Sequence, residues 1–223
     1  MVTSCVVSAQ YTSDPRFLIG ETDSVIDIGA HIGSFTVYAA QRAARGRVFS
    51  YEPDELSRRQ LEKNVGINGL GNVRIFREAV AGAGGSRAFY ATAFNNAESN
   101  FYWGGSSSRP VPCVTLEDIF LDNGIGHCDF LKLDCEGAEY EILLGTPPPL
   151  LRRIARISIE SHVGRYFGVQ GKSATPEALA KFLRRAGYSV HARRDNALHT
   201  IILARRDSSP SGLRFGTGSS RLP

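Results

Sequence analysis

The chain has 223 residues, of which 42% are hydrophobic and 22% charged, and its net charge is +4. This length suits one α/β domain with a single core, and the composition is that of a globular protein. No apolar run is long enough to span a membrane, and the first residues lack the basic and apolar segments of a signal peptide, so we expect a cytoplasmic protein.

The cysteines of the chain have neither a metal-binding nor a disulfide pattern. They stand at Cys5, Cys113, Cys128 and Cys135, without a CxxC pair. We therefore expect reduced thiols. Arginine pairs are frequent late in the chain, but aromatic residues do not alternate with them, so a groove for single-stranded nucleic acid is disfavoured.

Short β-branched segments alternate with helical patterns in the first part of the chain. We predict strands over residues 25–28, 47–51 and 73–80 and helices over residues 34–44 and 54–68. This order of strand, helix, strand, helix and strand is typical of an α/β fold, a doubly wound, mostly parallel sheet with helices on both faces.

The middle of the chain interrupts this alternation. Residues 87–93 and 111–115 have the pattern of strands, and the polar, aromatic and glycine-rich residues 94–109 lie between them. We predict an inserted β-hairpin, about residues 82–115, with a long loop. Loops of this length in compact domains are often lids or binding loops. The candidate contacts for a polyol or sugar acceptor in this loop are Asn95, Asn96, Ser99 and Trp103.

The α/β alternation returns after the hairpin. We expect helices over residues 116–123, 137–144 and 175–187, a rigid spacer over residues 146–149, and strands over residues 130–133, 154–160, 188–192 and 200–204. The last two strands are expected to pair with each other. Residues 1–206 then form one domain, and the Ser/Gly-rich residues 207–223 have the composition of a disordered tail.

The sequence VIDIGAHIG at residues 25–33 places a glycine turn after an apolar strand. The spacing of Gly29 and Gly33 differs from the GxGxxG of dinucleotide-binding proteins. Asp27 would repel a pyrophosphate and attract a cation, which favours a cofactor with an amino group. Glu52, at the tip of the second strand, can accept hydrogen bonds from both hydroxyls of a ribose. Together these residues predict a nucleotide-type site suited to S-adenosylmethionine.

Three segments of the chain resemble the FkbM family of S-adenosylmethionine-dependent methyltransferases. They are VIDIGAHIGSFTVYAA, FSYEPD and CDFLKLDCEGAEYEILLG. They correspond to the family's acid-x-Gly-Ala-Asn-x-Gly turn, its strand ending in Glu-Pro, and its Lys-x-Asp-x-Glu-Gly-x-Glu segment. Generic class I methyltransferases lack the third segment, and His31 departs from the usual asparagine. The resemblance implies a seven-stranded Rossmann-like sheet with a reversed final strand.

The resemblance also implies that S-adenosylmethionine is the cofactor and that Asp27, Gly29 and Glu52 contact it. The other candidates for the cofactor site are Ala30, His31, Gly33, Pro53, Ala79, Val80 and Asp134, with Ala79 and Val80 near the adenine. Only 24 residues precede the first predicted strand, so part of a substrate-covering segment is expected to be missing or reorganised.

Transfer of a methyl group to a hydroxyl requires a base near the carboxyl ends of the strands. Strand alternation places Lys132 and Asp134 on one face of their strand, where the lysine can hold an acid ionised. Glu160 and His162 share a face of the next strand. We predict that His162 is the base, because its ordinary pKa lies near neutrality, and that Glu160 orients it or the acceptor. Asp134 would position the cofactor or the acceptor, and Glu136 is a candidate acceptor contact.

Several alternatives remain open beside this hypothesis. An oxygen-rich metal site is one, although the resemblance does not imply it and we favour a site without metal; its ligands would be Asp134, Glu136, Glu160 and His162. The chain could also be an NAD-dependent oxidoreductase, an RNA-directed methyltransferase or binding module, or a fold that binds the cofactor without turnover. The leading hypothesis is an O-methyltransferase acting on a small molecule, either a secondary metabolite or a sugar or glycan, with no membrane or nucleic-acid partner.

Overall fold

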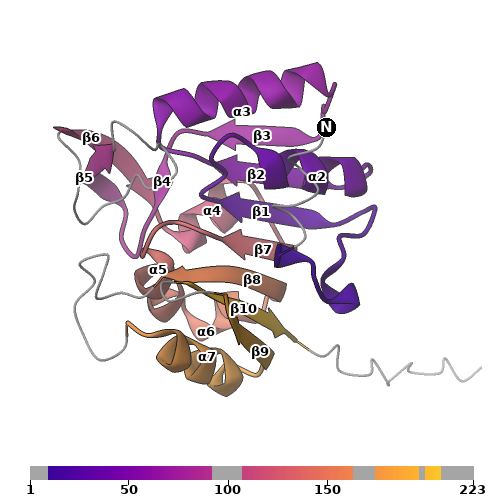
Figure 1. Cartoon of the computed structure of the whole chain (residues 1–223), viewed down its shortest axis with the longest axis vertical. Helices are drawn as coiled ribbons and strands as arrows, with labels where there is room; N and C mark the ends of the chain where they lie inside the picture. The colour runs from indigo at the N-terminus through magenta and orange to yellow at the C-terminus, as the bar shows by residue number, and fades with distance from the viewer. Residues whose placement is uncertain (1–9, 92–106, 163–173, 196–198, 207–223) are drawn as a thin grey trace, which may run out of the picture.

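A seven-stranded sheet with the order β3-β2-β1-β7-β8-β10-β9 forms the centre of the protein (Figure 1). The computed structural model describes residues 10–91, 107–162, 174–195 and 199–206. The strands are β1 (Ser24–Ile28), β2 (Arg47–Tyr51), β3 (Val73–Phe76), β7 (Cys128–Leu133), β8 (Ile154–His162), β9 (Ser189–Arg194) and β10 (His199–Arg205). Strands β3, β2, β1, β7 and β8 run parallel, and β10 is antiparallel to both neighbours. The predicted α/β class and the reversed final strand are therefore confirmed.

Helices cover both faces of this sheet. They are the 3-10 turn η1 (Pro15–Phe17) and the α-helices α2 (Ser34–Arg42), α3 (Glu55–Ile67), α4 (Leu116–Asp122), α5 (Glu139–Gly145), α6 (Pro148–Leu151) and α7 (Pro176–Arg185). In Figure 1, α2 lies in front of the strands and α4 behind them. Phe35 of α2 packs against Phe130 of β7 on the first face. On the second face, α4, α5 and α7 contribute Ile119, Leu143 and Leu179 to a larger core.

The carboxyl ends of β1, β2, β7 and β8 meet at one edge of the sheet. Parallel pairing places Asp27 beside Lys132, and Lys132 beside Ser158. The arrowheads of these strands point the same way in Figure 1. Ligands of open parallel sheets bind at this edge. The residues that directly follow these strands are therefore the first candidates for a functional site.

The predicted strand over residues 73–80 is two strands rather than one. β3 ends at Phe76, and β4 (Ala79–Val80) joins a second sheet of order β4-β6-β5. β4 pairs with β6 in parallel, so that Ala79 lies opposite Cys113. The chain changes its pairing partner after Phe76, from the edge of the main sheet to the inserted segment, and this change requires the break.

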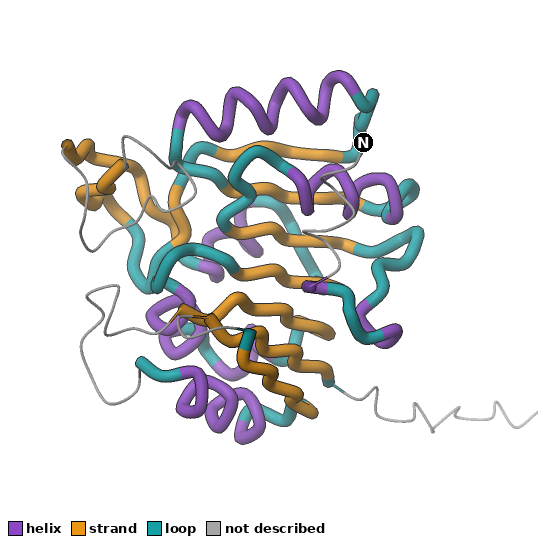
Figure 2. Tube along the Cα trace, in the orientation of Figure 1, coloured by secondary structure: helices purple, strands orange, loops and turns teal. Residues whose placement is uncertain are grey.

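The predicted inserted hairpin is confirmed. β5 (Gly85–Ala91) and β6 (Ser107–Val114) pair antiparallel and extend from the left side of the molecule in Figure 2. Because β6 begins at Ser107, the predicted loop over residues 94–109 extends too far at its second end. The four loop residues proposed to contact an acceptor, Asn95, Asn96, Ser99 and Trp103, lie outside the described residues, as does the predicted tail 207–223.

Two smaller predictions have different outcomes. The expected rigid spacer over residues 146–149 is wrong in part, because Pro148 and Pro149 begin the short helix α6, where their missing N–H groups cost no helical hydrogen bond. The thiols of Cys113, Cys128 and Cys135 are free, as expected, and Cys5 lies outside the described residues. Within the described part of the chain, no helix has the length and apolar character needed to cross a membrane.

Candidate active site

The turn between β1 and α2 depends on two glycines. Gly29 and Gly33 have φ angles of 74° and 86°, in the left-handed region that side chains disfavour. A Cβ atom on Gly29 would lie 1.7 Å from the carbonyl oxygen of Asp134, and one on Gly33 would lie 2.3 Å from Cδ1 of Leu61. The first glycine therefore lets β1 meet the end of β7, and the second lets α2 approach α3.

Substituting Gly29 by alanine should destabilise the protein more than the same change at Gly69. Both glycines have positive φ angles, of 74° and 64°, but no atom lies within 4 Å of a Cβ on Gly69. Gly69→Ala should cost about 1–2 kcal/mol from the left-handed conformation alone, whereas Gly29→Ala adds a backbone clash of about 1–3 kcal/mol. Urea unfolding of both variants measures the difference. Equal losses of unfolding free energy in the two variants would show that the backbone at Asp134 moves aside at little cost.

The N–H groups of this turn are directed at β2. The N–H groups of Gly29 and Ala30 both donate to the carbonyl oxygen of Tyr51 at 3.1 Å, and that of His31 donates to Oε2 of Glu52 at 2.7 Å. A phosphate-binding loop turns such groups toward its ligand instead. This arrangement disfavours a pyrophosphate at the turn.

Glu52 follows β2 and is held by the backbone on both sides. Its Oε1 accepts a hydrogen bond from the N–H of Asp54 at 2.7 Å, opposite the bond from His31 to Oε2. Burial raises the pKa of Glu52 to about 7, although both backbone donors act in the opposite direction. Each carboxylate oxygen keeps a second acceptor position. Glu52 is thus a fixed acceptor beside the turn.

His31 has a conformational role in the turn. Its φ angle is 51°, and it is one of two residues other than glycine with a positive φ in the described part of the chain. Asparagine and histidine are among the residue types that enter this region more readily than most. His31 is therefore of a residue type that can adopt the backbone conformation this turn requires, and its N–H group reaches Glu52. Burial lowers the pKa of its imidazole.

Asp27 and Lys132 form a buried pair behind the turn. Asp27 is completely buried and accepts a hydrogen bond from Oγ1 of Thr36 at 2.6 Å. Nζ of Lys132 lies 3.2 Å from Oδ1 of Asp27 and donates to the carbonyl oxygen of Gly29 at 2.6 Å. The structure gives the Asp27 carboxylate no exposed surface, so it does not support the predicted direct contact with a cofactor. Asp27 acts on the turn through Lys132.

Lys132 also reaches the end of β7. Its Nζ lies 3.6 Å from Oδ2 of Asp134. Burial lowers the pKa of Lys132, but Asp27 and Asp134 outweigh this effect and leave the pKa above its ordinary value. The lysine is therefore a permanent cation between two carboxylates. This pairing agrees with the prediction from strand alternation that Lys132 holds an acid ionised.

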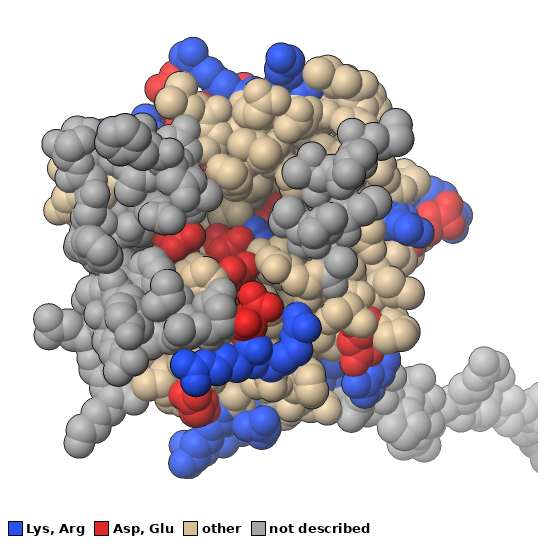
Figure 3. All heavy atoms as spheres, viewed as in Figure 1, with Lys and Arg blue, Asp and Glu red and all other residues tan. Residues whose placement is uncertain are grey.

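Acidic and histidine side chains gather at the ends of β7, β8 and β10. We call them the His162 cluster, and its members are Asp134, Glu136, Glu160, His162 and His199. Nε2 of His162 lies 3.3 Å from Oε2 of Glu136 and 4.0 Å from Oδ1 of Asp134. Figure 3 shows acidic atoms in a hollow in the middle of the face seen in Figure 1. The predicted catalytic residues therefore share one site.

The partner that orients His162 is Glu139 and not the predicted Glu160. Glu139 is completely buried at the start of α5, and its Oε1 lies 2.9 Å from Nδ1 of His162. The same carboxylate accepts hydrogen bonds from the N–H groups of Cys135 and Gly137 at 2.9 and 3.0 Å. Glu139 thus fixes both the turn after β7 and the plane of the imidazole.

The protonation state of His162 differs from the one predicted. Burial lowers its pKa, but Glu139, Glu136 and Asp134 outweigh this and raise the pKa to about 10. Burial also raises the pKa of Glu136 to about 8. The expectation that His162 titrates near neutrality is therefore wrong for this environment, because three carboxylates favour the imidazolium form.

Glu160 is held by the segment that precedes β1. The hydroxyl of Tyr11 lies 2.8 Å from Oδ2 of Asp134 and 2.9 Å from Oε2 of Glu160. Nε2 of Gln10 donates to the same Glu160 oxygen at 2.8 Å, and Nδ1 of His199 lies 3.2 Å from Oε1. Gln10 and Tyr11 of this segment thus contact two members of the His162 cluster, Glu160 and Asp134.

The sequence did not single out Gln10, Tyr11 or His199 as site residues. No pattern marks the first two, which lie in an irregular segment. His199 could have been found, because the antiparallel pairing of β8 with β10 places it directly opposite His162. The signal is therefore the register of the last strand rather than a motif.

The remaining cofactor candidates are mostly packing residues. Ala30, Ala79 and Val80 are 3–4% exposed, and the last two pair with β6 in the second sheet. Their contact with an adenine stays a prediction. The carbonyl oxygen of Pro53 accepts a hydrogen bond from Arg109 of β6 at 3.0 Å, which ties the end of β2 to the inserted hairpin.

Comparison with known proteins identifies the family. The model of the methyltransferase FkbM domain matches residues 27–190. The chain is 30% identical over 215 residues to the AMB antimetabolite synthetase AmbE of Pseudomonas aeruginosa, an alignment that covers 78% of this chain and 10% of that protein. The chain thus spans only a small part of this relative.

Solved structures share the fold at low identity. The crystal structure of methyltransferase FkbM from Methylobacillus flagellatus matches with a TM-score of 0.61 and 15% identity, over 88% of this chain and 47% of that one. Magnesium protoporphyrin IX methyltransferase of Synechocystis with bound SAH matches with a TM-score of 0.51 and 16% identity, over 92% and 82%. These likenesses show the class I methyltransferase fold. With the family model covering the turn, Glu52 and the ends of β7 and β8, the chain belongs to the FkbM family of methyltransferases.

Proposed function

We propose that this protein is an S-adenosylmethionine-dependent O-methyltransferase that acts on a hydroxyl of a small molecule. The observation that carries the proposal is the position of Lys132, whose Nζ contacts Gly29 of the turn at 2.6 Å and lies 3.6 Å from Asp134. Lys132 thus connects the glycine turn, the cofactor side of the site in this proposal, with the His162 cluster, its acceptor side. Membership of the FkbM family and the SAH bound to the Synechocystis relative support the choice of cofactor.

The residues beside the turn fit this cofactor. Glu52 offers two fixed acceptor oxygens, which suit the two hydroxyls of a ribose. The N–H groups of Gly29, Ala30 and His31 are directed at β2, which suits a cofactor without phosphate. S-adenosylmethionine supplies the methyl group as part of a sulfonium, so the protein has to align the acceptor and exclude water.

The His162 cluster is the acceptor side in this proposal. Asp134 and Glu160 each have one oxygen held by Tyr11 and another directed at a histidine, so they can accept a hydrogen bond from an acceptor hydroxyl. The carboxylates around His162 raise its pKa to about 10, well above the range of a general base, so we assign it the orientation of the carboxylates and the hydroxyl. The proton of the hydroxyl then passes to a carboxylate of the cluster.

A secondary metabolite or a sugar is the acceptor class that we propose. AmbE, the relative with 30% identity, is by its name an antimetabolite synthetase, which favours a specialised metabolite. The excess of carboxylates in the His162 cluster disfavours a polyanion such as RNA as the acceptor, because like charges would repel its phosphates. The acceptor is therefore expected to be neutral or cationic.

Calorimetry of cofactor binding, followed by a transfer assay, tests the proposal. We expect binding of S-adenosylhomocysteine with one site per chain and no heat with NAD, since the turn directs its N–H groups at β2. Transfer of labelled methyl from S-adenosylmethionine to members of a panel of hydroxylated metabolites and sugars would support the acceptor class. Binding of NAD in preference to S-adenosylhomocysteine would overturn the proposal.

Replacing His162 by glutamine should lower turnover much more than cofactor affinity. His162 contacts the cluster carboxylates and not the turn, so we expect kcat to fall by about 10²-fold, the loss typical of a displaced acceptor group, with the dissociation constant of S-adenosylhomocysteine unchanged. His127→Gln is the matched control, because the His127 side chain is 55% exposed and pairs with Asp129. Parallel loss of turnover and affinity in His162→Gln would mean that His162 only supports the fold.

A further inference from the structure

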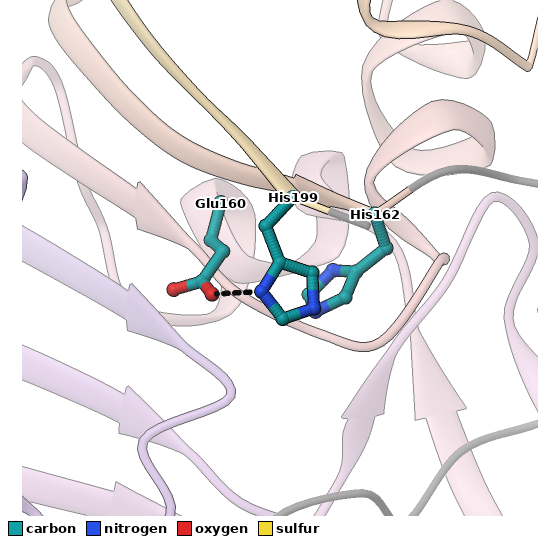
Figure 4. Close-up of side chains that lie close together, drawn as sticks. All are labelled: Glu160, His162 and His199. Carbon is teal, nitrogen blue, oxygen red and sulfur yellow. Dashed lines mark ion pairs between the residues drawn. The ribbon is translucent and has the colours of Figure 1, made fainter. Parts of the chain in front are cut away.

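The His162 cluster contains two sets of potential metal ligands that share one histidine. Asp134, Glu136 and His162 offer ligand atoms that all lie within 4.8 Å of one another, and so do Glu160, His162 and His199. Figure 4 shows the second set, with the rings of His162 and His199 one behind the other and Glu160 facing His199. The ring centroids are 4.8 Å apart. The two sets therefore adjoin at a single location.

The surroundings of His162 select one of its ring nitrogens as a ligand. Nδ1 pairs with Glu139 at 2.9 Å, so that Nε2 is directed toward Glu136 at 3.3 Å. Metal-binding histidines commonly donate from their second nitrogen to a carboxylate, which fixes the tautomer and the ring plane. With Nδ1 as the donor to Glu139, Nε2 and the Glu136 oxygen are both acceptors. A positive charge, either a proton or a metal ion, has to lie between them.

The carboxylates are also arranged with one oxygen held and the other available. Oδ2 of Asp134 and Oε2 of Glu160 both contact the Tyr11 hydroxyl, at 2.8 and 2.9 Å. The other oxygens, Oδ1 of Asp134 and Oε1 of Glu160, face His162 and His199. Such hydrogen bonds to the ligand side chains from outside the site orient them before an ion arrives. This provides preorganisation that a group of solvated surface acids lacks.

The charges and the backbone at the cluster indicate the same kind of ligand. Asp134, Glu136 and Glu139 all pair with His162, while Lys132, which lies beside Asp134, is shared with the buried Asp27. Glu136 has a φ angle of 53°. A residue other than glycine stays in the left-handed region of backbone angles only where its surroundings hold it there, often at functional sites. The turn thus brings a carboxylate to Nε2 of His162 at a cost in backbone strain.

We propose that the His162 cluster binds one divalent transition-metal ion, with Asp134, Glu136 and His162 as ligands and Glu160 and His199 adjoining. Mixed carboxylate and imidazole ligands suit Mn²⁺, Fe²⁺ and Zn²⁺. The ligand atoms have to move toward the ion, because bonds to such ions are about 2.0–2.3 Å long. A cation here would favour the ionised form of an acceptor hydroxyl beside it, and this role alone rests on the proposed function.

Metal binding by the full chain tests the proposal without an activity assay. Protein stripped with a chelator is titrated with Mn²⁺ and followed by electron paramagnetic resonance, and Zn²⁺ binding is measured by equilibrium dialysis with elemental analysis. We expect one ion per chain, a loss of affinity of tenfold or more in Glu136→Gln and in Asp134→Asn, and a smaller loss in His199→Gln. His127→Gln, at an exposed position before β7 and thus at the opposite end of that strand from Asp134, should bind as the unchanged protein does.

Two results would overturn the metal site. One is the absence of Mn²⁺ and Zn²⁺ binding in protein that still binds S-adenosylhomocysteine by calorimetry, which leaves a proton as the charge beside His162 and leaves the proposed function intact. The other is undiminished binding in both Glu136→Gln and Asp134→Asn, which would place the ion elsewhere. If the unchanged protein bound the metal ion but not S-adenosylhomocysteine, this result would instead contradict the proposed function.

Discussion

Replacing Lys132 by methionine is expected to lower the free energy of unfolding by about 3–5 kcal/mol, because it leaves a buried carboxylate without its partner. Lys132 and Asp27 are 3% and 0% exposed, and the two side chains lie 3.2 Å apart. Methionine replaces the unbranched chain up to Cε but removes the charged Nζ and its hydrogen bond to Gly29. Urea unfolding monitored by circular dichroism measures the loss.

Two further variants separate the ion pair from packing. The double variant Asp27→Asn/Lys132→Met removes both charges, so it should recover part of the stability that Lys132→Met loses. Lys63→Met on the exposed side of α3 is the matched control and should change stability by less than about 0.5 kcal/mol. If Lys132→Met were as stable as Lys63→Met, the pair would not support the turn.

The cofactor side was the easier part to predict from sequence. The turn and Glu52 each follow directly after a strand, and parallel strands β1 and β2 bring their carboxyl ends together without any tertiary detail. Alternation along β7 likewise placed Lys132 and Asp134 on one face. Side-chain alternation could not predict how deeply a side chain is buried. Asp27 lies at the same edge, yet its side chain is buried behind the turn. Burial of a strand residue depends on the helix above it, here α2 with Thr36.

The side-chain pairs of the acceptor side could not be predicted from the sequence, because no motif specifies the backbone geometry that forms them. Glu139 pairs with His162 directly after a turn in which Glu136 and Gly137 both adopt positive φ angles, of 53° and 103°. That conformation is not apparent from Glu-Gly in a sequence. Tyr11 reaches Asp134 across 123 positions of the chain, from a segment without periodicity. Side-chain alternation therefore found which acids share an edge but not which of them pair.

The pKa of His162 shows why residue type alone misassigned a role. An isolated histidine titrates near neutrality, which made His162 the natural choice as a base. Glu139 and Glu136 lie at 2.9 and 3.3 Å from its two nitrogens, and they favour the charged form more than burial disfavours it. Only the identity and distance of these neighbours decide the outcome. A catalytic role assigned from an ordinary pKa is therefore provisional until the surroundings of the group are known.

Replacing Glu52 by glutamine should weaken binding of S-adenosylhomocysteine about 100-fold. Two hydrogen bonds from ribose hydroxyls to a carboxylate contribute about 1.5 kcal/mol each or more, and every 1.4 kcal/mol is a factor of about ten in affinity. The amide also places an N–H group against the N–H of His31 or Asp54, which disturbs the acceptor geometry. Isothermal titration calorimetry measures the change. Glu55→Gln, three residues further on with a side chain 44% exposed and paired with Arg59, is the control and should bind normally.

The pH dependence of binding gives this prediction a second measurement. Burial raises the pKa of Glu52 to about 7, and only the ionised carboxylate can accept both ribose hydroxyls without giving up a proton. Affinity for S-adenosylhomocysteine should therefore rise between pH 6 and pH 8 in the unchanged protein and stay low and flat in Glu52→Gln. An equal pH response in both proteins would assign the titration to another group.

The stability of the same two proteins should change with pH in the opposite sense. A buried acid with a raised pKa stabilises the folded chain most below its ordinary pKa, and this contribution is lost as the pH rises through about 7. Glutamine has no such loss. The free energy of unfolding of Glu52→Gln should therefore increase relative to the unchanged protein between pH 5 and pH 8, while its cofactor affinity stays low. Stability curves that remain parallel over this range would show that Glu52 is ionised throughout, and hence that the backbone donors outweigh burial.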